Sequence, residues 1–350
     1  MKRRAWLFAA LALLAVAAWL MSRGDSRARP RPEVKVEFPR HAKPEENARN
    51  NQRRTLPPKP PEKPTDEYRP RRDPVLTALP WTKGKSALVF EASALRDSPL
   101  GKLWLDCMLS KHDLAEMARF KSAYGVDVMQ DIDRVAMSSE RVGVVSGTFS
   151  EARFDTPERS HRAYGVKGMI YEDREGQGRP LALWDKTMLI FSPKVEAIEA
   201  AIDRLEDRGP PSTPLLPEWA AYGDVYGLIS AEDLSALLPP SQKEIADRLR
   251  GAVDKIELHV DASEDVGIVA DVTGPNGEEV DDFGKSLGAA LSLGRLKAQS
   301  EGDDKLAQLM ELAKVAPRDG RFSVDLALPM PLIQQQLGPC PRDRDRRDKD

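Results

Sequence analysis

The feature that most constrains this chain is an uncharged apolar segment close to its N-terminus. The segment covers residues 5–21, is rich in Ala and Leu, and follows the basic residues Lys2, Arg3 and Arg4. As a helix it would be about 25 Å long, slightly less than the hydrocarbon thickness of a bilayer. Such a segment indicates an uncleaved membrane anchor, a cleaved signal peptide or a buried helix of a soluble protein. The first two place the rest of the chain at or beyond a membrane.

The residues near the end of this segment separate the alternatives. Ala15 and Ala17 provide the small-x-small pattern at which a signal peptidase cleaves. Trp19 and the two residues after it extend the apolar run past that site, and a tryptophan suits an interfacial position. The short basic N-terminus is typical of a signal anchor that leaves the following domain outside the cytoplasm. The sequence therefore predicts a single-pass protein anchored by residues 1–21, with an extracytoplasmic folded region; secretion after cleavage near Ala18 is the alternative.

Residues 22–75 have the composition of a disordered spacer. They contain 11 of the 28 prolines, few large apolar side chains and dense mixed charge, including the run PPKPPEKP at 57–64. Such a segment cannot bury enough apolar surface to offset the entropy of folding. Fully extended, 54 residues would reach roughly 170 Å, and a flexible coil would average nearer 40 Å. The sequence predicts a linker that lets the folded region work away from its anchor.

An N-terminal anchor followed by a Lys-Pro and Glu-Pro spacer and a C-terminal domain resembles the TonB-type energy transducers. The resemblance covers residues 1–75 and rests on composition. In that family the membrane helix carries a Ser and a His that engage a proton-driven partner, whereas residues 5–21 contain neither. The resemblance therefore implies a spacer role and argues against energy transduction.

Apolar spacing in residues 76–338 alternates between strand and helix periods, which predicts an α+β fold with antiparallel sheets and packed helices. Ser98 and Pro99 form an N-cap and first-turn pair. A second helix is expected from Asp113 to Tyr124, ending at Gly125. Another helix after Pro193 places apolar residues on one face. Strands are expected at 87–90, 134–138, 142–149, 164–171, 181–184 and 187–191, and after position 217 at 224–229, 255–260, 267–272 and 321–328.

The Pro-rich stretch 209–217 divides this region into two parts, 76–208 and 218–338, followed by a charged disordered tail at 339–350. The strand pattern at 133–137 (DRVAM) recurs at 254–258 (DKIEL), and that at 140–145 (ERVGVV) recurs at 264–269 (EDVGIV). The order and spacing of these matches predict a duplicated α+β unit. Coincidence between two short strand patterns is the alternative.

Net charge and cysteine content limit the partners and the compartment. Residues 1–75 carry a net charge of +9 and residues 76–338 a net charge of −13. An acidic folded region repels phosphate, so nucleic-acid binding is not expected. Cys107 falls on the apolar face of a predicted helix and Cys340 in the polar tail. We expect a buried small side chain and a free terminal thiol rather than a disulfide.

Motifs that carry chemistry fail on their context. Residues 284–288 (GKSLG) match the nucleophile elbow of hydrolases, but Ser286 follows an acidic segment with a helical pattern, and no His lies downstream. A phosphate-binding loop would need a Gly at position 279, where the chain has Glu279. We therefore expect no catalytic or cofactor-binding residue.

Metal ligands also lack the required spacing. The four histidines, His41, His112, His161 and His259, are scattered, and His259 is expected to point outward from a strand. Three carboxylate pairs are assigned to helix N-termini and turns, where acids are common for electrostatic reasons. Asn276 indicates a turn. A calcium loop there would need ligands at alternate positions, and Pro275 interrupts that pattern. The pairs are Asp131/Asp133, Asp281/Asp282 and Asp303/Asp304.

The sequence thus favours a membrane-tethered, extracytoplasmic binding or scaffolding module of a bacterial cell envelope. Its expected partners are the membrane, through residues 5–21, and another envelope protein. Two alternatives stay open: a hydrolase-like enzyme with a site assembled from distant loops, and an envelope linker of the energy-transducer type.

Overall fold

A computed structural model describes residues 36–337, except 54, 58–71, 81, 83, 175–177, 210–215, 237 and 239–242. The predicted anchor at 1–21 and the tail at 339–350 lie outside the described residues. None of the helices described is both long and apolar enough to cross a membrane.

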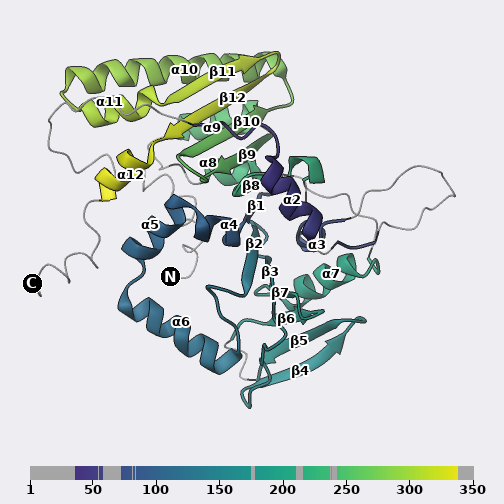
Figure 1. Cartoon of the computed structure of the whole chain (residues 1–350). Helices are drawn as coiled ribbons and strands as arrows, with labels where there is room; N and C mark the ends of the chain where they lie inside the picture. The colour runs from purple at the N-terminus through teal and green to yellow at the C-terminus, as the bar shows by residue number, and fades with distance from the viewer. Residues whose placement is uncertain are drawn as a thin grey trace, which may run out of the picture. The chain divides into compact units, whose positions relative to one another are not determined.

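The contacts divide the chain into two compact units. Unit 1 consists of the described residues of Met1–Arg40, Leu95–Leu109 and Ile229–Asp350, and unit 2 consists of those of His41–Ala94 and Ser110–Leu228. Each unit holds an antiparallel sheet with helices packed on it, so the predicted α+β class with antiparallel sheets is confirmed (Figure 1).

The sheet of unit 2 has the strand order β8-β1-β2-β3-β7-β6-β5-β4, and its paired neighbours are antiparallel. Alternate strand residues point to the same face, and on one face these are apolar and buried. The strands are β1 (Ala87–Phe90), β2 (Ile132–Ser138), β3 (Gly143–Gly147), β4 (Arg159–Tyr164), β5 (Gly168–Asp173), β6 (Leu181–Trp184), β7 (Met188–Phe191) and β8 (Val225–Ser230).

Helices α3 (Pro74–Ala78) and α7 (Val195–Leu205) pack together and contribute to the apolar core of unit 2. In α7 the buried residues Ile198, Ala201, Ile202 and Leu205 recur at helical spacing, as the sequence predicts. The other helical segments that lie in or enter this unit are α2 (Pro44–Gln52), α4 (Ala92–Asp97), α6 (Lys111–Tyr124) and the 3₁₀ turn η1 (Glu218–Ala220).

The sheet of unit 1 has the order β11-β12-β10-β9, again antiparallel. The long helix α10 packs against β11 and β12, and Figure 1 shows it with α11 along this sheet. The strands are β9 (Lys255–Asp261), β10 (Val266–Thr273), β11 (Ala313–Arg318) and β12 (Arg321–Leu328). The helices are α5 (Pro99–Met108), α8 (Ala231–Ser235), α9 (Lys243–Ala252), α10 (Gly277–Ser300), α11 (Asp304–Glu311) and α12 (Met330–Leu337).

Local sequence signals explain most of these elements. The side chain of Ser98 caps α5, and Gly125 ends α6 in the left-handed conformation, both as expected. The strand expected at 164–171 is wrong in detail, because Gly165 adopts a φ of 71° and turns the chain between β4 and β5. The predicted duplication, with its boundaries at 76–208 and 218–338, stays a prediction.

The described part of the segment 22–75 differs from the predicted disordered spacer. Pro44–Gln52 forms α2, and α3 begins at Pro74 with the Asp73 side chain as its N-cap. Leu56 and Arg72 exchange backbone hydrogen bonds of 2.9 and 3.3 Å. Composition predicts disorder because few apolar residues are present, whereas these residues are held mainly by ion pairs and hydrogen bonds.

Candidate functional site

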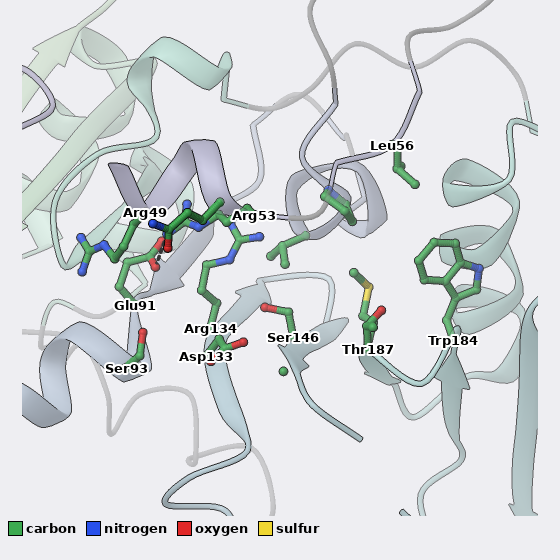
Figure 2. A pocket seen from close by; sticks show the side chains of 15 residues that line it. Arg49, Arg53, Leu56, Glu91, Ser93, Asp133, Arg134, Ser146, Trp184 and Thr187 are labelled. Carbon is green, nitrogen blue, oxygen red and sulfur yellow. Dashed lines mark hydrogen bonds and ion pairs between the residues drawn. The ribbon is translucent and has the colours of Figure 1, made fainter. Parts of the chain in front are cut away.

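A cavity of about 360 Å³ lies within unit 2. Its walls come from α2 and the residues that follow it, the start of α3, Glu91 and the start of α4, strands β2 and β3, and the β6–β7 hairpin. Leu56, Val75 and Met188 give it an apolar part, while three arginines and two carboxylates give it a charged part (Figure 2). This volume lies at the lower end of the range for ligand pockets, so the cavity suits a small ligand.

A buried ion pair beside the cavity joins Arg134 of β2 to Asp73. Arg134 Nη1 and Nη2 donate hydrogen bonds of 2.6 and 3.0 Å to the two carboxylate oxygens. Burial alone would raise the pKa of Asp73, but the Arg134 guanidinium outweighs it and holds this pKa below its ordinary value. Burial would likewise lower the pKa of Arg134, and Asp73 raises it instead. Both groups therefore stay charged, and neither is free for a ligand.

A second buried ion pair joins Glu91 to Arg53, and Glu91 is only 2% exposed. Arg53 Nη2 donates to one carboxylate oxygen at 2.5 Å, and the hydroxyl of Tyr226 donates to the other at 3.0 Å. Burial, reinforced by the charge of Glu91, raises the pKa of Tyr226, so this hydroxyl keeps its proton. Glu91 is thus satisfied by the protein itself.

Helix α2 is also fixed at its first turn by Glu46. This side chain accepts hydrogen bonds from the backbone N–H groups of Lys43 (3.0 Å) and Gly223 (3.2 Å). Burial raises the pKa of Glu46 despite these two donors. Together with the Arg53–Glu91 pair, these bonds hold α2 in place as one wall of the cavity.

Several polar side chains in the cavity have no partner within the described part of the chain. They are the side-chain amide of Gln52, the hydroxyls of Ser93, Ser146 and Thr187 and the exposed carboxylate of Asp133. Arg49 differs from them, because its Nη1 lies 4.0 Å from Asp224 while its Nε is buried without a hydrogen-bond partner. The cavity therefore offers one carboxylate, one amide and three hydroxyls to a ligand.

Asp133 owes its position to an irregularity in β2. The pairing of β2 with β3 shifts between Ile132 and Arg134, so Asp133 is an extra residue in the strand. Bulges of this kind re-aim side chains and are common beside functional sites. The bulge allows Asp133 to line the cavity next to Arg134, although the two are adjacent in a strand.

The residues of the hydrolase-like motif lie in unit 1, inside α10. Ser286 donates a hydrogen bond of 2.8 Å to the carbonyl of Asp282, one helical turn earlier. Gly284 is a packing position, since a Cβ there would approach the Phe322 ring to 2.8 Å. The glycine at position 284 therefore allows α10 to pack closely on the sheet. Ser286 lies inside a helix, so the motif does not have the geometry of a nucleophile elbow.

The histidines and paired acids considered as metal ligands are dispersed as well. No group of three or more His, Cys, Asp or Glu residues in the described ranges could hold a metal ion. His41 is exposed and His161 Nδ1 lies 3.0 Å from Asp155. The paired acids serve local structure: Asp131 accepts from the Asp127 N–H, Asp281 from the Gly320 N–H, and Asp303 caps α11. His112 lies in the first turn of α6.

Two sequence predictions are wrong at the level of single residues. His259 is fully buried rather than outward-facing, with its Nε2 3.3 Å from Glu257, because that face of the unit 1 sheet is covered too. Cys107 is disulfide-bonded rather than free. Cys340 lies outside the described residues.

Sequence reasoning missed the cavity residues, although one local signal was present. Asp73 followed by Pro74 is an N-cap and first-turn pair, which predicts the start of α3 inside the supposed spacer. Arg134 and Asp133 stand in a strand whose other residues are mostly apolar, yet nothing in the sequence indicates that Asp73 is the partner of Arg134.

Comparison with protein-family models and with curated proteins finds no match for this chain. A solved structure, "Structure of crystal form I of TP0453", is similar at a TM-score of 0.40 and 11% sequence identity. The alignment covers 76% of this chain and 96% of that chain.

Proposed function

We propose that this chain is a membrane-tethered, extracytoplasmic binding module of a cell envelope. Residues 5–21 form the anchor, and the three preceding basic residues keep the N-terminus in the cytoplasm. The cavity of unit 2 is the binding site.

The observation that carries the extracytoplasmic placement is the disulfide at Cys107. Disulfides persist in oxidising compartments and are rare in the cytosol, where thiols are kept reduced. The chain has only two cysteines, so Cys340 is the only intrachain partner available. An oxidised cysteine pair agrees with an anchor that exports the folded region.

The residues that follow the proposed anchor closely in the sequence already pack in unit 1. Val36 packs in this unit, where a Cβ on Gly267 would come within 2.9 Å of its side chain. Arg40 Nη2 donates to both carboxylate oxygens of Asp325 of β12, at 2.7 and 2.6 Å. Only residues 22–35 separate these contacts from the anchor, and 14 residues span at most about 50 Å. The proposed module therefore works close to its membrane instead of at the end of a long spacer.

The charge pattern in the cavity favours binding over catalysis. The carboxylates of Glu91 and Asp73 are both ion-paired and hydrogen-bonded by the protein. A general acid or base needs a titratable group within reach of the substrate. Asp133 is the one carboxylate left without a partner among the described lining residues, and the other groups left over are hydroxyls and an amide. Such groups orient a ligand through hydrogen bonds.

The tether is tested by fractionating cells that produce the full chain and extracting the membranes with carbonate. We expect the protein in the extracted membrane pellet, and its folded region should be digested when protease is added outside the cytoplasmic membrane. The variant Leu13→Arg/Leu14→Arg should leave the membrane fraction, because each arginine at the centre of a span costs about 2.5–3.5 kcal/mol. The control Leu13→Val/Leu14→Val should stay in the membrane. A wild-type chain in the soluble fraction, or one with a mature mass starting near Ala18, would contradict the tether.

A further inference from the structure

We infer that the cavity of unit 2 binds a small neutral sugar, a polyhydroxylated ring of monosaccharide size. The inference rests on the binding role proposed above and deepens it by naming the class of ligand. The observation that carries it is the set of polar groups left without a partner in the described part of the wall, which consists of three hydroxyls, one amide and one carboxylate.

The charged groups of the wall favour a neutral ligand. The three cavity arginines are all paired within the protein: Arg134 with Asp73, Arg53 with Glu91, and Arg49 with Asp224. An anionic ligand would find no free guanidinium group and would meet the unpaired carboxylate of Asp133. A cationic ligand would meet that carboxylate, but with three guanidinium groups in the same wall. Electrostatic complementarity therefore selects neither sign of charge.

The unpartnered groups are distributed along the cavity instead of meeting at one point. Ser93 lies in α4, Ser146 in β3 and Thr187 in the turn between β6 and β7, and Figure 2 shows their side chains apart from one another. Asp133 of β2 adds a carboxylate, and Gln52 at the end of α2 adds an amide. A ligand that reaches groups spread in this way needs several hydrogen-bonding groups around its perimeter.

Sugar hydroxyls match this set of donors and acceptors. The carboxylate of Asp133 only accepts hydrogen bonds, whereas the serine and threonine hydroxyls and the amide of Gln52 both donate and accept. A sugar hydroxyl also donates and accepts, so it pairs with every member of the set. Its hydrogen bond to a carboxylate is charge-assisted and about twice as strong as a neutral one. A ligand whose polar groups only accept would gain nothing from Asp133.

The apolar part of the wall suits the carbon atoms of a sugar ring. Leu56, Val75 and Met188 are buried and line the cavity. Trp184 lines it too, and its Nε1 donates to Glu206 at 3.1 Å, so the indole offers the cavity only ring carbons. Sugar rings carry C–H groups between their hydroxyls, and burying these against apolar side chains is favourable. The volume of about 360 Å³ suits one ring and excludes a long glycan.

Binding to the full chain is measured by isothermal titration calorimetry, with the disulfide intact and in a polyoxyethylene detergent that carries no sugar. The probes are glucose, galactose and mannose, and the best of them is compared with its uronate and its 2-amino derivative, which keep the ring and add one charge of either sign. We expect at least one neutral hexose to bind with a Kd below about 1 mM, and its uronate to bind at least about 10-fold more weakly. The amino derivative should bind no more tightly than the hexose.

A methyl glycoside of the best hexose separates two sources of such a sugar. Equal binding of the glycoside would indicate the end of a longer glycan, and lost binding would indicate a free monosaccharide.

Two variants and two matched controls locate the site. Asp133→Ala should weaken hexose binding about 10-fold or more, and Thr187→Val about 5-fold, because each removes a hydrogen-bonding group from the wall. Asp97→Ala and Thr273→Val make the same replacements outside the cavity, at an exposed position of α4 and in β10 of unit 1, and should leave binding unchanged. Urea midpoints equal to wild type show that the cavity variants fold normally. If the midpoint of Thr187→Val is lowered, Ser146→Ala takes its place, because it removes another unpartnered hydroxyl.

Absence of binding by all the neutral hexoses, or binding that the cavity variants retain in full, would overturn the inference. Tighter binding of the uronate or the amino derivative than of the hexose would also overturn it, because the site would then recognise a charge. That last result would keep the cavity as a binding site and contradict only the class of ligand. The membrane fraction and the thiol state test the tethered module separately, so the two failures are distinguishable.

Discussion

Replacing Asp73 with alanine is expected to lower the free energy of unfolding by about 3–5 kcal/mol, because Arg134 would be left buried without its partner. The side chain of Arg134 is only 6% exposed, and Asp73 is its two-pronged partner. Asp73 also caps α3 by accepting from the Val75 and Leu76 N–H groups, and loss of an N-cap alone costs about 0.5–2 kcal/mol. Urea denaturation of the full chain measures the change.

A double variant separates the buried charge from the cap. Asp73→Asn/Arg134→Met should be more stable than Asp73→Ala, because it removes the unpaired charge and keeps a capping side chain. Asp247→Ala breaks an exposed pair with Arg250 and should change stability by less than about 1 kcal/mol. An equal, small effect of Asp73→Ala and Asp247→Ala would contradict the ion-paired architecture of the cavity.

The same pair predicts a direction for the pH dependence. The pKa of Asp73 is held below its ordinary value of 3.8 in the folded state. Its contribution to stability is therefore present above that value and is lost as pH falls through the lower, folded-state pKa.

Replacing Phe322 with alanine is expected to destabilise unit 1 by about 3–5 kcal/mol. Phe322 is 2% exposed in β12 and belongs to the core that α10 covers, with its ring 6.0 Å from that of Phe283. Because Gly284 is fitted closely to this ring, the helix cannot move far enough to fill the space left by the truncation. Thermal unfolding followed by circular dichroism measures the loss.

The control for this variant lies on the same helix. Leu293 is 67% exposed on α10, and Leu293→Ala should change stability by no more than about 0.5 kcal/mol. Similar effects of the two substitutions would mean that α10 is not packed on β12.

Elements with strong apolar periodicity could be predicted from the sequence. Helix α7 and the β2–β3 hairpin are examples, because their buried faces follow from the spacing of Ile, Leu and Val. The segment containing α2 could not be predicted in this way, because Arg53, Glu46 and Asp73 are stabilised by partners far along the chain. Composition cannot show such pairs, so a polar segment that is held by them is predicted to be a disordered spacer.

The candidate site escaped prediction for a related reason. Asp133 belongs to a strand pattern, and only the bulge against β3 brings it to the cavity. Alternation along one strand predicts an exposed His259, because it says nothing about what covers the second face of the sheet. The position of Cys107 on the apolar face of a predicted helix leads to the prediction of a buried, unpaired side chain, because a local pattern cannot show a disulfide partner distant in the sequence.

The thiol state of the chain inside cells tests most directly the claim that this is an exported, tethered module. Cells producing the full chain are denatured in acid and labelled with a maleimide polymer, with and without prior reduction. We expect no labelled thiol before reduction and two after it, since both cysteines would be oxidised beyond the membrane. A variant lacking residues 2–21 should stay in the cytosol and show both thiols reduced. Two free thiols in the full chain would contradict the account.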